Sequence, residues 1–231
     1  MKAGWTFVLA WLLAVAAVAE ADAQTGPYPN KPVQIITDSS AGSTPDVALR
    51  IVADGLTQGW KQQVLVNNHP GAGASLAVRL ASGAAPDGYT LYQPVLSTFV
   101  SLRSPAPNVP VHVPQDFLSI GFVAENPMFI AVASAKRLAE FPDVPTVAET
   151  IPGFQAAGWA VLVAAIGTSE AIIDKISEDL RKVTLDPELQ KKLAPLGSYT
   201  NPMSPAEATA FVHKQQQTWQ PILDEIAKNQ R

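Results

Sequence analysis

The sequence predicts an α/β fold built around a mainly parallel sheet. Short apolar runs of strand length alternate with segments of helical periodicity, and turn or capping residues stand between them. The chain has 231 residues, of which 47% are hydrophobic, which is enough to bury the core of one domain or of two small ones. It contains no cysteine, so we expect neither a disulfide scaffold nor a lipid-anchored cysteine.

The first 23 residues have the three parts of a secretory signal peptide. Lys2 precedes an apolar run from Trp5 to Ala19, and the pattern Ala21-Asp22-Ala23 provides a cleavage site before Gln24. A membrane anchor is the alternative, but a run of roughly 15 residues is shorter than the roughly 20 that a spanning helix needs. We therefore expect cleavage after Ala23, export to the periplasm, and no membrane-embedded segment after processing.

The charge and the histidines argue against several classes of partner. Cleavage leaves 15 of the 16 basic and 18 of the 20 acidic residues, a net charge of −3. We therefore expect no basic surface for nucleic acid or anionic lipid. His69, His112 and His213 lack metal-ligand spacing, and no cysteine accompanies them, so we expect no metal site. No cofactor is expected either.

The first half of the mature chain alternates strands with helices. Thr44-Pro45-Asp46 marks a helix start, with Thr44 as the predicted N-cap. A turn at Pro86-Asp87-Gly88 precedes a strand, and a proline-rich loop follows from 104 to 116. The predicted elements are a strand over Val33–Thr37, a strand over Gln63–Asn67, a helix over Ala72–Ser82 and a strand from Thr90.

The second half has further strands and a helical C-terminal third. Strand-like runs cover 118–124, 128–133 and 159–165. Ser169 can cap a helix, Asp186-Pro187 starts another, and Ser204 to Glu207 has the pattern of a capping box. The apolar face of the first of these helices consists of Ile173, Ile176, Leu180 and Val183.

The glycine loop HPGAGASLAV, residues 69–78, raises the question of a nucleotide site, because it lies between a strand and a helix. A dinucleotide fingerprint needs a small residue where this chain has Leu76. It also needs an acidic residue after the next strand, whereas Asp87 lies in the turn before it. We therefore interpret Gly71 and Gly73 as residues of a sharp turn.

Catalytic motifs are not recognised in the sequence. There is no Gly-x-Ser-x-Gly nucleophile elbow, and the carboxylate pair Asp224-Glu225 fits a solvated helix face. We therefore predict that the protein is not an enzyme. A periplasmic α/β enzyme acting on a small carboxylate or ester stays open as an alternative, because a fold alone does not fix a function.

The loop DSSAGSTPD, residues 38–46, is the strongest candidate for binding chemistry. It joins the carboxyl end of a predicted strand to a helix N-terminus, where open α/β sheets bind ligands. Free backbone amides and the helix dipole there favour an anion such as a carboxylate. Asp46 either caps the helix or meets a ligand amine or a water. Trp159, after Gly158 at the mouth of a strand, belongs either to the core or to a pocket wall.

Four stretches taken together resemble one known family. They are similar to the Bug-type (TctC-like) extracytoplasmic solute-binding receptors of tripartite tricarboxylate transporters, over nearly the whole mature chain. The most specific pair is NNHPGAGA with PDGYTL. The stretches are YPNKPVQIITDSSAGSTPDVALRIVA, VLVNNHPGAGASLAVRLASGAAPDGYTL, SAKRLAEFPDVPTVAET and GWAVLVAAIGT.

The resemblance implies a periplasmic-binding-protein fold of type II, with two lobes that close on a small carboxylated metabolite. Such a receptor presents its solute to the permease subunits in the membrane. The family holds the ligand carboxylate largely with backbone amides and bridging waters. Carried over to this chain, the ligand-binding residues are Ser39, Ala41, Gly42, Ser43, Thr44, Asp46, Ser97, Thr98 and Trp159.

Two departures from the family pattern affect what is expected of this chain. Ser39 replaces an aromatic residue and Ser43 a glycine, which leaves the identity of the ligand open. Most of the family's second domain is also missing, and its two ends are joined near Ala133-Ser134. We expect a signal peptide over 1–23, a discontinuous first domain over 24–117 plus 158–231, and a truncated second lobe over 118–157. Impaired ligand binding follows, and a non-binding interaction domain is a further alternative.

Overall fold

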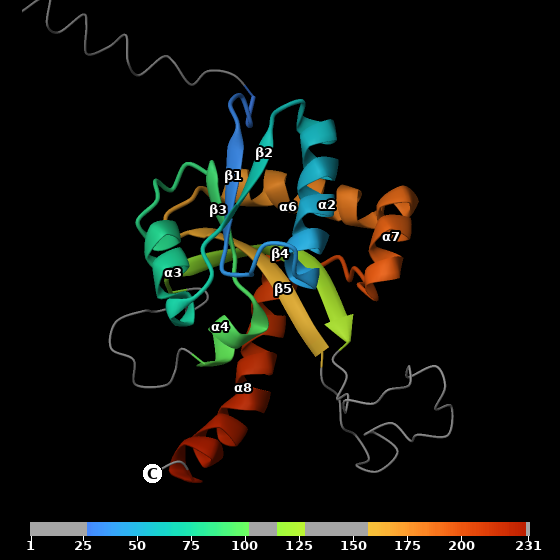
Figure 1. The fold of residues 1–231 in the computed structure, drawn as a ribbon. Helices are drawn as coiled ribbons and strands as arrows, with labels where there is room; N and C mark the ends of the chain where they lie inside the picture. Colours follow the sequence, from blue (N-terminus) through green and yellow to red (C-terminus); the bar gives the residue numbers. More distant parts are fainter. Residues whose placement is uncertain (1–26, 102–114, 128–156, 230–231) are drawn as a thin grey trace, which may run out of the picture.

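The computed structural model describes residues 27–101, 115–127 and 157–229 (Figure 1). The predicted signal peptide, most of the proline-rich loop, the predicted strand over 128–133 and the junction near Ala133 lie outside these residues. Within them, no helix is both long and apolar enough to cross a membrane.

A five-stranded sheet in the order β2-β1-β3-β5-β4 forms the centre of the described fold. β1 pairs in parallel with β2 and β3, while β5 runs antiparallel to both β3 and β4. The predicted α/β class is therefore confirmed, but the described sheet is mixed: β1, β2 and β3 pair in parallel, whereas β5 is reversed and pairs antiparallel on both sides. The strands are β1 (Val33–Thr37), β2 (Val64–Asn68), β3 (Thr90–Gln93), β4 (Phe117–Pro127) and β5 (Ala157–Ala165).

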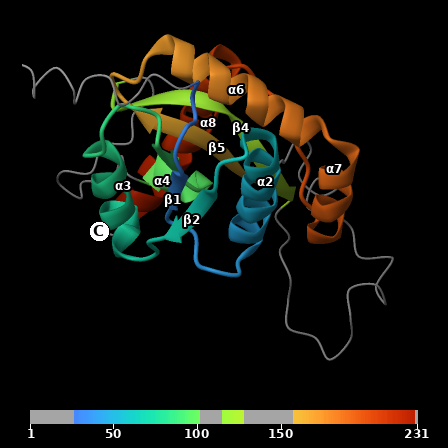
Figure 2. The ribbon, with the colours of Figure 1, turned by 90° about the horizontal axis from the view of Figure 1, so that it is seen from above.

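Helices cover both faces of the sheet because each presents one apolar stripe to it (Figure 2). One face packs against α2 (Thr44–Trp60), α6 (Glu170–Leu185) and α7 (Pro187–Leu193). The other packs against α3 (Ser75–Ser82), α4 (Leu96–Ser101) and α8 (Pro205–Asn229). β5 lies between the two cores, which explains why seven of its nine residues, from Trp159 to Ala165, are buried.

The helix starts follow the capping residues closely. Asp186 accepts a hydrogen bond from the Glu188 amide at 2.8 Å, and Ser204 and Glu207 make the two reciprocal bonds of the predicted capping box. The N-cap of α2, however, is Ser43 and not Thr44, because Ser43 still has extended backbone angles (φ −70°, ψ 159°). The prediction was therefore wrong by one residue at this end.

The glycine loop after β2 is a tight left-handed turn. Gly71, Ala72, Gly73 and Ala74 all have positive φ, from 49° to 92°. They form a short 3₁₀ turn, η1 (Ala72–Ala74), and α3 starts only at Ser75. The predicted helix start at Ala72 was therefore three residues too early, because these backbone angles are incompatible with a right-handed α-helix.

Residues 118–127 differ from their predicted place in a second lobe. They lie in the central sheet as part of β4, which pairs with β5 along its length and buries Ile120, Phe122 and Val123. A strand continues through the predicted boundary at 117. Residues 128–156 lie outside the described part of the chain, so the division into lobes stays a prediction.

Candidate functional site

Three loops meet at the edge of the sheet where β1, β2 and β3 end. Parallel strands bring their carboxyl ends to the same edge, which is where ligands bind in open α/β sheets. The amide of His69, after β2, donates to the Thr37 carbonyl at 2.8 Å. The amide of Val95, after β3, donates to Asp38 at 3.0 Å. The 38–46 loop is therefore joined to both of its neighbours.

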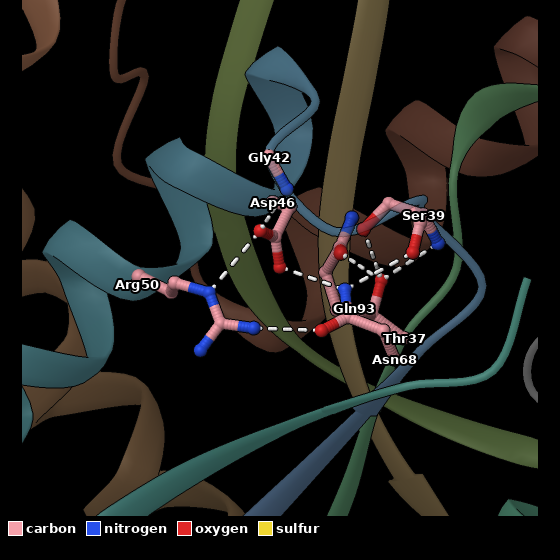
Figure 3. Close-up of polar contacts among 7 residues, drawn as sticks. All are labelled: Thr37, Ser39, Gly42, Asp46, Arg50, Asn68 and Gln93. Carbon is pink, nitrogen blue, oxygen red and sulfur yellow. Dashed lines mark hydrogen bonds and ion pairs between the residues drawn. The ribbon is translucent and has the colours of Figure 1, made fainter.

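The start of the 38–46 loop is fixed by the buried side chain of Thr37 (Figure 3). Its hydroxyl donates to Oε1 of Gln93 at 2.7 Å. The hydroxyl oxygen of Thr37 also accepts a hydrogen bond from the Ser39 amide at 3.2 Å, and it lies 2.9 Å from the hydroxyl oxygen of Ser39. Since Thr37 uses its one proton on Gln93, the Ser39 hydroxyl donates to Thr37. Both donors of Ser39 are thus engaged within the protein.

The end of the loop is fixed by Asp46, which is 1% exposed (Figure 3). Oδ2 of Asp46 accepts from the Gly42 amide at 2.8 Å and from Nε of Arg50 at 3.1 Å. Oδ1 accepts from Nδ2 of Asn68 at 2.7 Å, and Arg50 also donates to Oδ1 of Asn68 at 2.6 Å. Asn68 further donates to the Ser39 carbonyl at 3.0 Å, which joins the two ends of the loop.

These contacts leave Asp46 ionised despite its burial. Burial alone acts to raise the pKa of the carboxyl group. The hydrogen bonds from Arg50, Asn68 and Gly42 and the charge of Arg50 together outweigh it, so the pKa lies below its ordinary value. Of the two sequence-based alternatives, the structure shows Asp46 bound within the protein, where it organises the loop.

A set of amides remains available for a ligand. The N–H groups of Ser40, Ala41 and Thr44 have no hydrogen-bond acceptor in the described structure, and all three residues are exposed. The hydroxyl of Ser43 is buried and also without a partner there, and it does not cap α2. Amides at a helix N-terminus attract anions, so this arrangement suits a carboxylate. By contrast, the Gly42 amide is engaged by Asp46.

The remaining predicted residues lie beside this loop but contribute differently. Ser97 is exposed on α4, whereas Thr98 is 3% exposed and its hydroxyl donates to Asp38. Trp159 is 4% exposed, and its ring packs 5.1 Å from both the Phe99 and the Phe211 ring centroids. Its Nε1 has no hydrogen-bond partner within the described part of the chain. In this structure Trp159 belongs to the core.

Four residues that organise the loop were not among the predicted ones: Asp38, Arg50, Asn68 and Gln93. Arg50 was recognisable as the residue four positions after Asp46 on one helix face. Asn68 and Gln93 each end a strand, and polar side chains at the carboxyl ends of parallel strands converge. Among the described residues, no group of three His, Asp or Glu side chains could hold a metal ion.

Comparison with known proteins places the chain in a family. A model described as the tripartite tricarboxylate transporter family receptor matches residues 48–132 and 128–228. The chain belongs to this receptor family. A UPF0065 protein of Bordetella bronchiseptica is 23% identical to this receptor-family chain over 309 residues, covering 94% of the chain and 92% of the relative. Since 94% of 231 is about 217, about 92 of the 309 aligned positions have no counterpart here.

Solved structures show the same fold for this receptor-family chain. The periplasmic binding protein BugD has a TM-score of 0.73 at 20% identity, covering 86% of this chain and 98% of BugD. MatC of Rhodopseudomonas palustris with bound malate has a TM-score of 0.70 at 18% identity, and the match covers 84% of this chain and 99% of MatC. A further R. palustris protein, solved with adipate, has a TM-score of 0.71 at 15% identity, and the match covers 85% of this chain and 97% of that protein. The fold is that of a periplasmic binding protein, shortened relative to these structures.

Proposed function

We propose that this chain is a periplasmic receptor for a small carboxylated solute, held at the 38–46 loop. The observation that carries the proposal is the set of amides of the exposed residues Ser40, Ala41 and Thr44 at the start of α2, which have no acceptor among the described residues. Such a group of amides binds a small anion, a carboxylate among them, without a cationic side chain. The relatives solved with malate and adipate support the same ligand class.

The geometry supports binding because the loop is rigid before any ligand arrives. Thr37, Asn68 and Asp46 fix both ends of the loop through hydrogen bonds between 2.7 and 3.2 Å. A preorganised loop loses little conformational entropy when a ligand binds, so even a few hydrogen bonds yield measurable affinity.

We further propose that binding is weak. In the alignment with the Bordetella relative, about 92 positions have no counterpart in this chain. A receptor of two lobes gains affinity by enclosing its ligand and excluding water, and a site with one complete wall loses part of that gain. We expect dissociation constants near 0.1–1 mM, about a hundredfold or more above those of an enclosing site.

The exported location and the partner follow from family membership and the N-terminal segment. We propose that residues 1–23 are removed after Ala23 and that the mature chain works in the periplasm. Its proposed partners are the membrane permease subunits of a tripartite transporter, after which the family is named. Mass spectrometry of the exported form tests the cleavage. A mature protein that still begins at Met1 would contradict both the processing and the receptor role.

The site is tested by removing one amide without disturbing the helix. Thr44 is the first residue of α2, a position that proline favours, and Ser43 already has the extended backbone that precedes proline. Thr44→Pro therefore deletes one N–H, while Thr44→Ala keeps it and serves as the matched control. We expect calorimetric titration with a monocarboxylate such as hexanoate to show about tenfold weaker binding for Thr44→Pro than for Thr44→Ala.

Equal affinity in the two variants would contradict the proposed site. Turnover of a small carboxylate or ester by the purified protein, lost in Thr44→Pro, would instead favour the enzyme alternative. Absence of binding by the unmodified chain to every carboxylate up to about 10 mM would favour the interaction domain.

A further inference from the structure

Asp38 is a second buried carboxylate of the 38–46 loop, and the proposed site does not use it. It is 9% exposed, at the point where β1 ends. Oδ1 accepts from the Val95 amide at 3.0 Å. Oδ2 accepts from the Tyr92 hydroxyl at 3.0 Å and from the hydroxyl of Thr98. All three donors come from the end of β3 and the turn into α4.

The environment of Asp38 differs from that of Asp46 in one respect. Asp46 has the guanidinium of Arg50 at 3.1 Å, and its pKa is lowered. Asp38 is held by hydroxyls and an amide, and burial raises the pKa of its carboxyl group even though each of these hydrogen bonds acts to lower it. Among the described residues, the hydrogen bonds to Asp38 come from neutral donors only, whereas Asp46 also pairs with Arg50.

Three convergent donors around two carboxylate oxygens are what a protein presents to a small anion. Here the anion is a side chain of the same protein. The Thr98 hydroxyl, which the family resemblance assigned to the ligand, is turned toward Asp38 and is buried. The donors of Tyr92, Val95 and Thr98 are thereby bound by Asp38 and are not offered to a ligand carboxylate.

We propose that Asp38 is a specificity-determining residue that fills the carboxylate-binding position at the β3–α4 turn, so that the site accepts a solute with one carboxylate. This rests on the proposed function, since the solute's single carboxylate is the one bound by the 38–46 amides. The end of the solute that faces residues 94–98 is then neutral. A second carboxylate there finds the donors of Tyr92, Val95 and Thr98 already bound and is repelled by Asp38.

The first experiment tests the filled position by itself. Asp38→Ala removes a carboxylate group and leaves the donors of Tyr92, Val95 and Thr98 in place, and formate matches the group removed. We expect 100 mM sodium formate to raise the Tm of Asp38→Ala by about 3–6 °C more than 100 mM sodium chloride does. Asp54→Ala, which removes an exposed carboxylate of α2, is the control. Formate bound at the 38–46 amides would stabilise both variants alike, so the rise in Tm should be about 3–6 °C larger in Asp38→Ala than in Asp54→Ala.

An equal response of Asp38→Ala and Asp54→Ala to formate would overturn the proposal. If Asp38→Ala does not fold in chloride, its yield of folded protein on refolding in formate, compared with refolding in chloride, decides the same question. Recovery in formate alone supports the proposal, and failure in both media contradicts it.

The second experiment tests specificity with two acids of equal length. Adipate and hexanoate have six carbons and differ in one carboxylate. The isosteric Asp38→Asn removes the charge, so it should strengthen adipate binding about fivefold to tenfold and change hexanoate binding less than about twofold. Equal effects on the two acids would overturn the specificity claim. Absence of binding of either acid by every variant would contradict the proposed function, while the formate experiment would still decide the role of Asp38.

Discussion

The hydrogen-bond network around Asp46 predicts a large cost for Asp46→Asn. The carboxylate side chain is 2% exposed and accepts from Gly42 and Arg50 on one oxygen and from Asn68 on the other. An asparagine at position 46 keeps only one acceptor oxygen. Its amide N–H group must therefore face an N–H group either of Asn68 or of Gly42 and Arg50. Since a hydrogen bond to a buried charge contributes about 1.5–3 kcal/mol, we expect a loss of about 3 kcal/mol in the free energy of unfolding. The loss of the ion pair with Arg50 adds little to this cost, because the half-exposed guanidinium of Arg50 can be solvated by water in place of the Asp46 carboxylate.

Thermal and urea unfolding at pH 7 measure this loss, with Asp54→Asn on the exposed face of α2 as the matched control. About 3 kcal/mol corresponds to a fall of roughly 6–12 °C in Tm for a chain of this size. The folded pKa of Asp46 is lowered, so its contribution is complete above the ordinary pKa near 3.9 and disappears as the pH falls through the folded value. The difference between variant and unmodified chain should therefore narrow below about pH 4.

Two results would refute this reasoning. A loss below about 1 kcal/mol at pH 7 would mean that the loop relaxes freely around position 46. A loss that stays constant down to pH 3 would show that the charge of Asp46 contributes nothing.

Three further predictions concern the described fold. In Gly88→Ala the new Cβ would lie 2.5 Å from Cγ2 of Ile172 at a φ of +79°, so urea unfolding should show a loss of about 2–4 kcal/mol; a neutral result would contradict that contact. Trp60→Phe removes the 2.6 Å bond from Nε1 to Asp179 and should cost about 1–2 kcal/mol in the same assay. Burial raises the pKa of Asp38, so the free energy of unfolding of the unmodified chain should fall as the pH rises above about 4, and the fall should be smaller in Asp38→Asn. If the urea midpoints of the two proteins change identically with pH, Asp38 does not cause the fall.

The sequence predicted the elements whose signals are local. Val33–Thr37 is an apolar run with polar flanks, and Ser204 to Glu207 is a capping box, and both appear as expected. The short helix α4 was missed because its six residues, LSTFVS, are too few for a periodic pattern to show, although Leu96, Phe99 and Val100 have helical spacing. The start of α3 was misplaced because Ala72 and Ala74 adopt positive φ, which alanine disfavours and which no alanine-based signal can announce.

The site was predictable in position but not in its internal contacts. A strand followed by a serine- and glycine-rich loop and a helix start placed the anion site at 38–46. Which amides remain available depends on partners distant in the sequence. Gly42 is engaged because Asp46 turns back to it, and Asp46 is held in place by Asn68, 22 residues further on. No local pattern contains that pairing.

The central claim is that the exposed amides of the 38–46 loop bind a carboxylate. Titration of the ¹⁵N-labelled chain with hexanoate, followed by amide chemical shifts in NMR, tests it most directly. We predict that the largest downfield shifts occur at the amides of Ser40, Ala41 and Thr44, with saturation near millimolar hexanoate, while the Gly42 amide, already bound to Asp46, moves less. Shifts concentrated elsewhere on the protein, or none up to about 10 mM hexanoate, would contradict the claim.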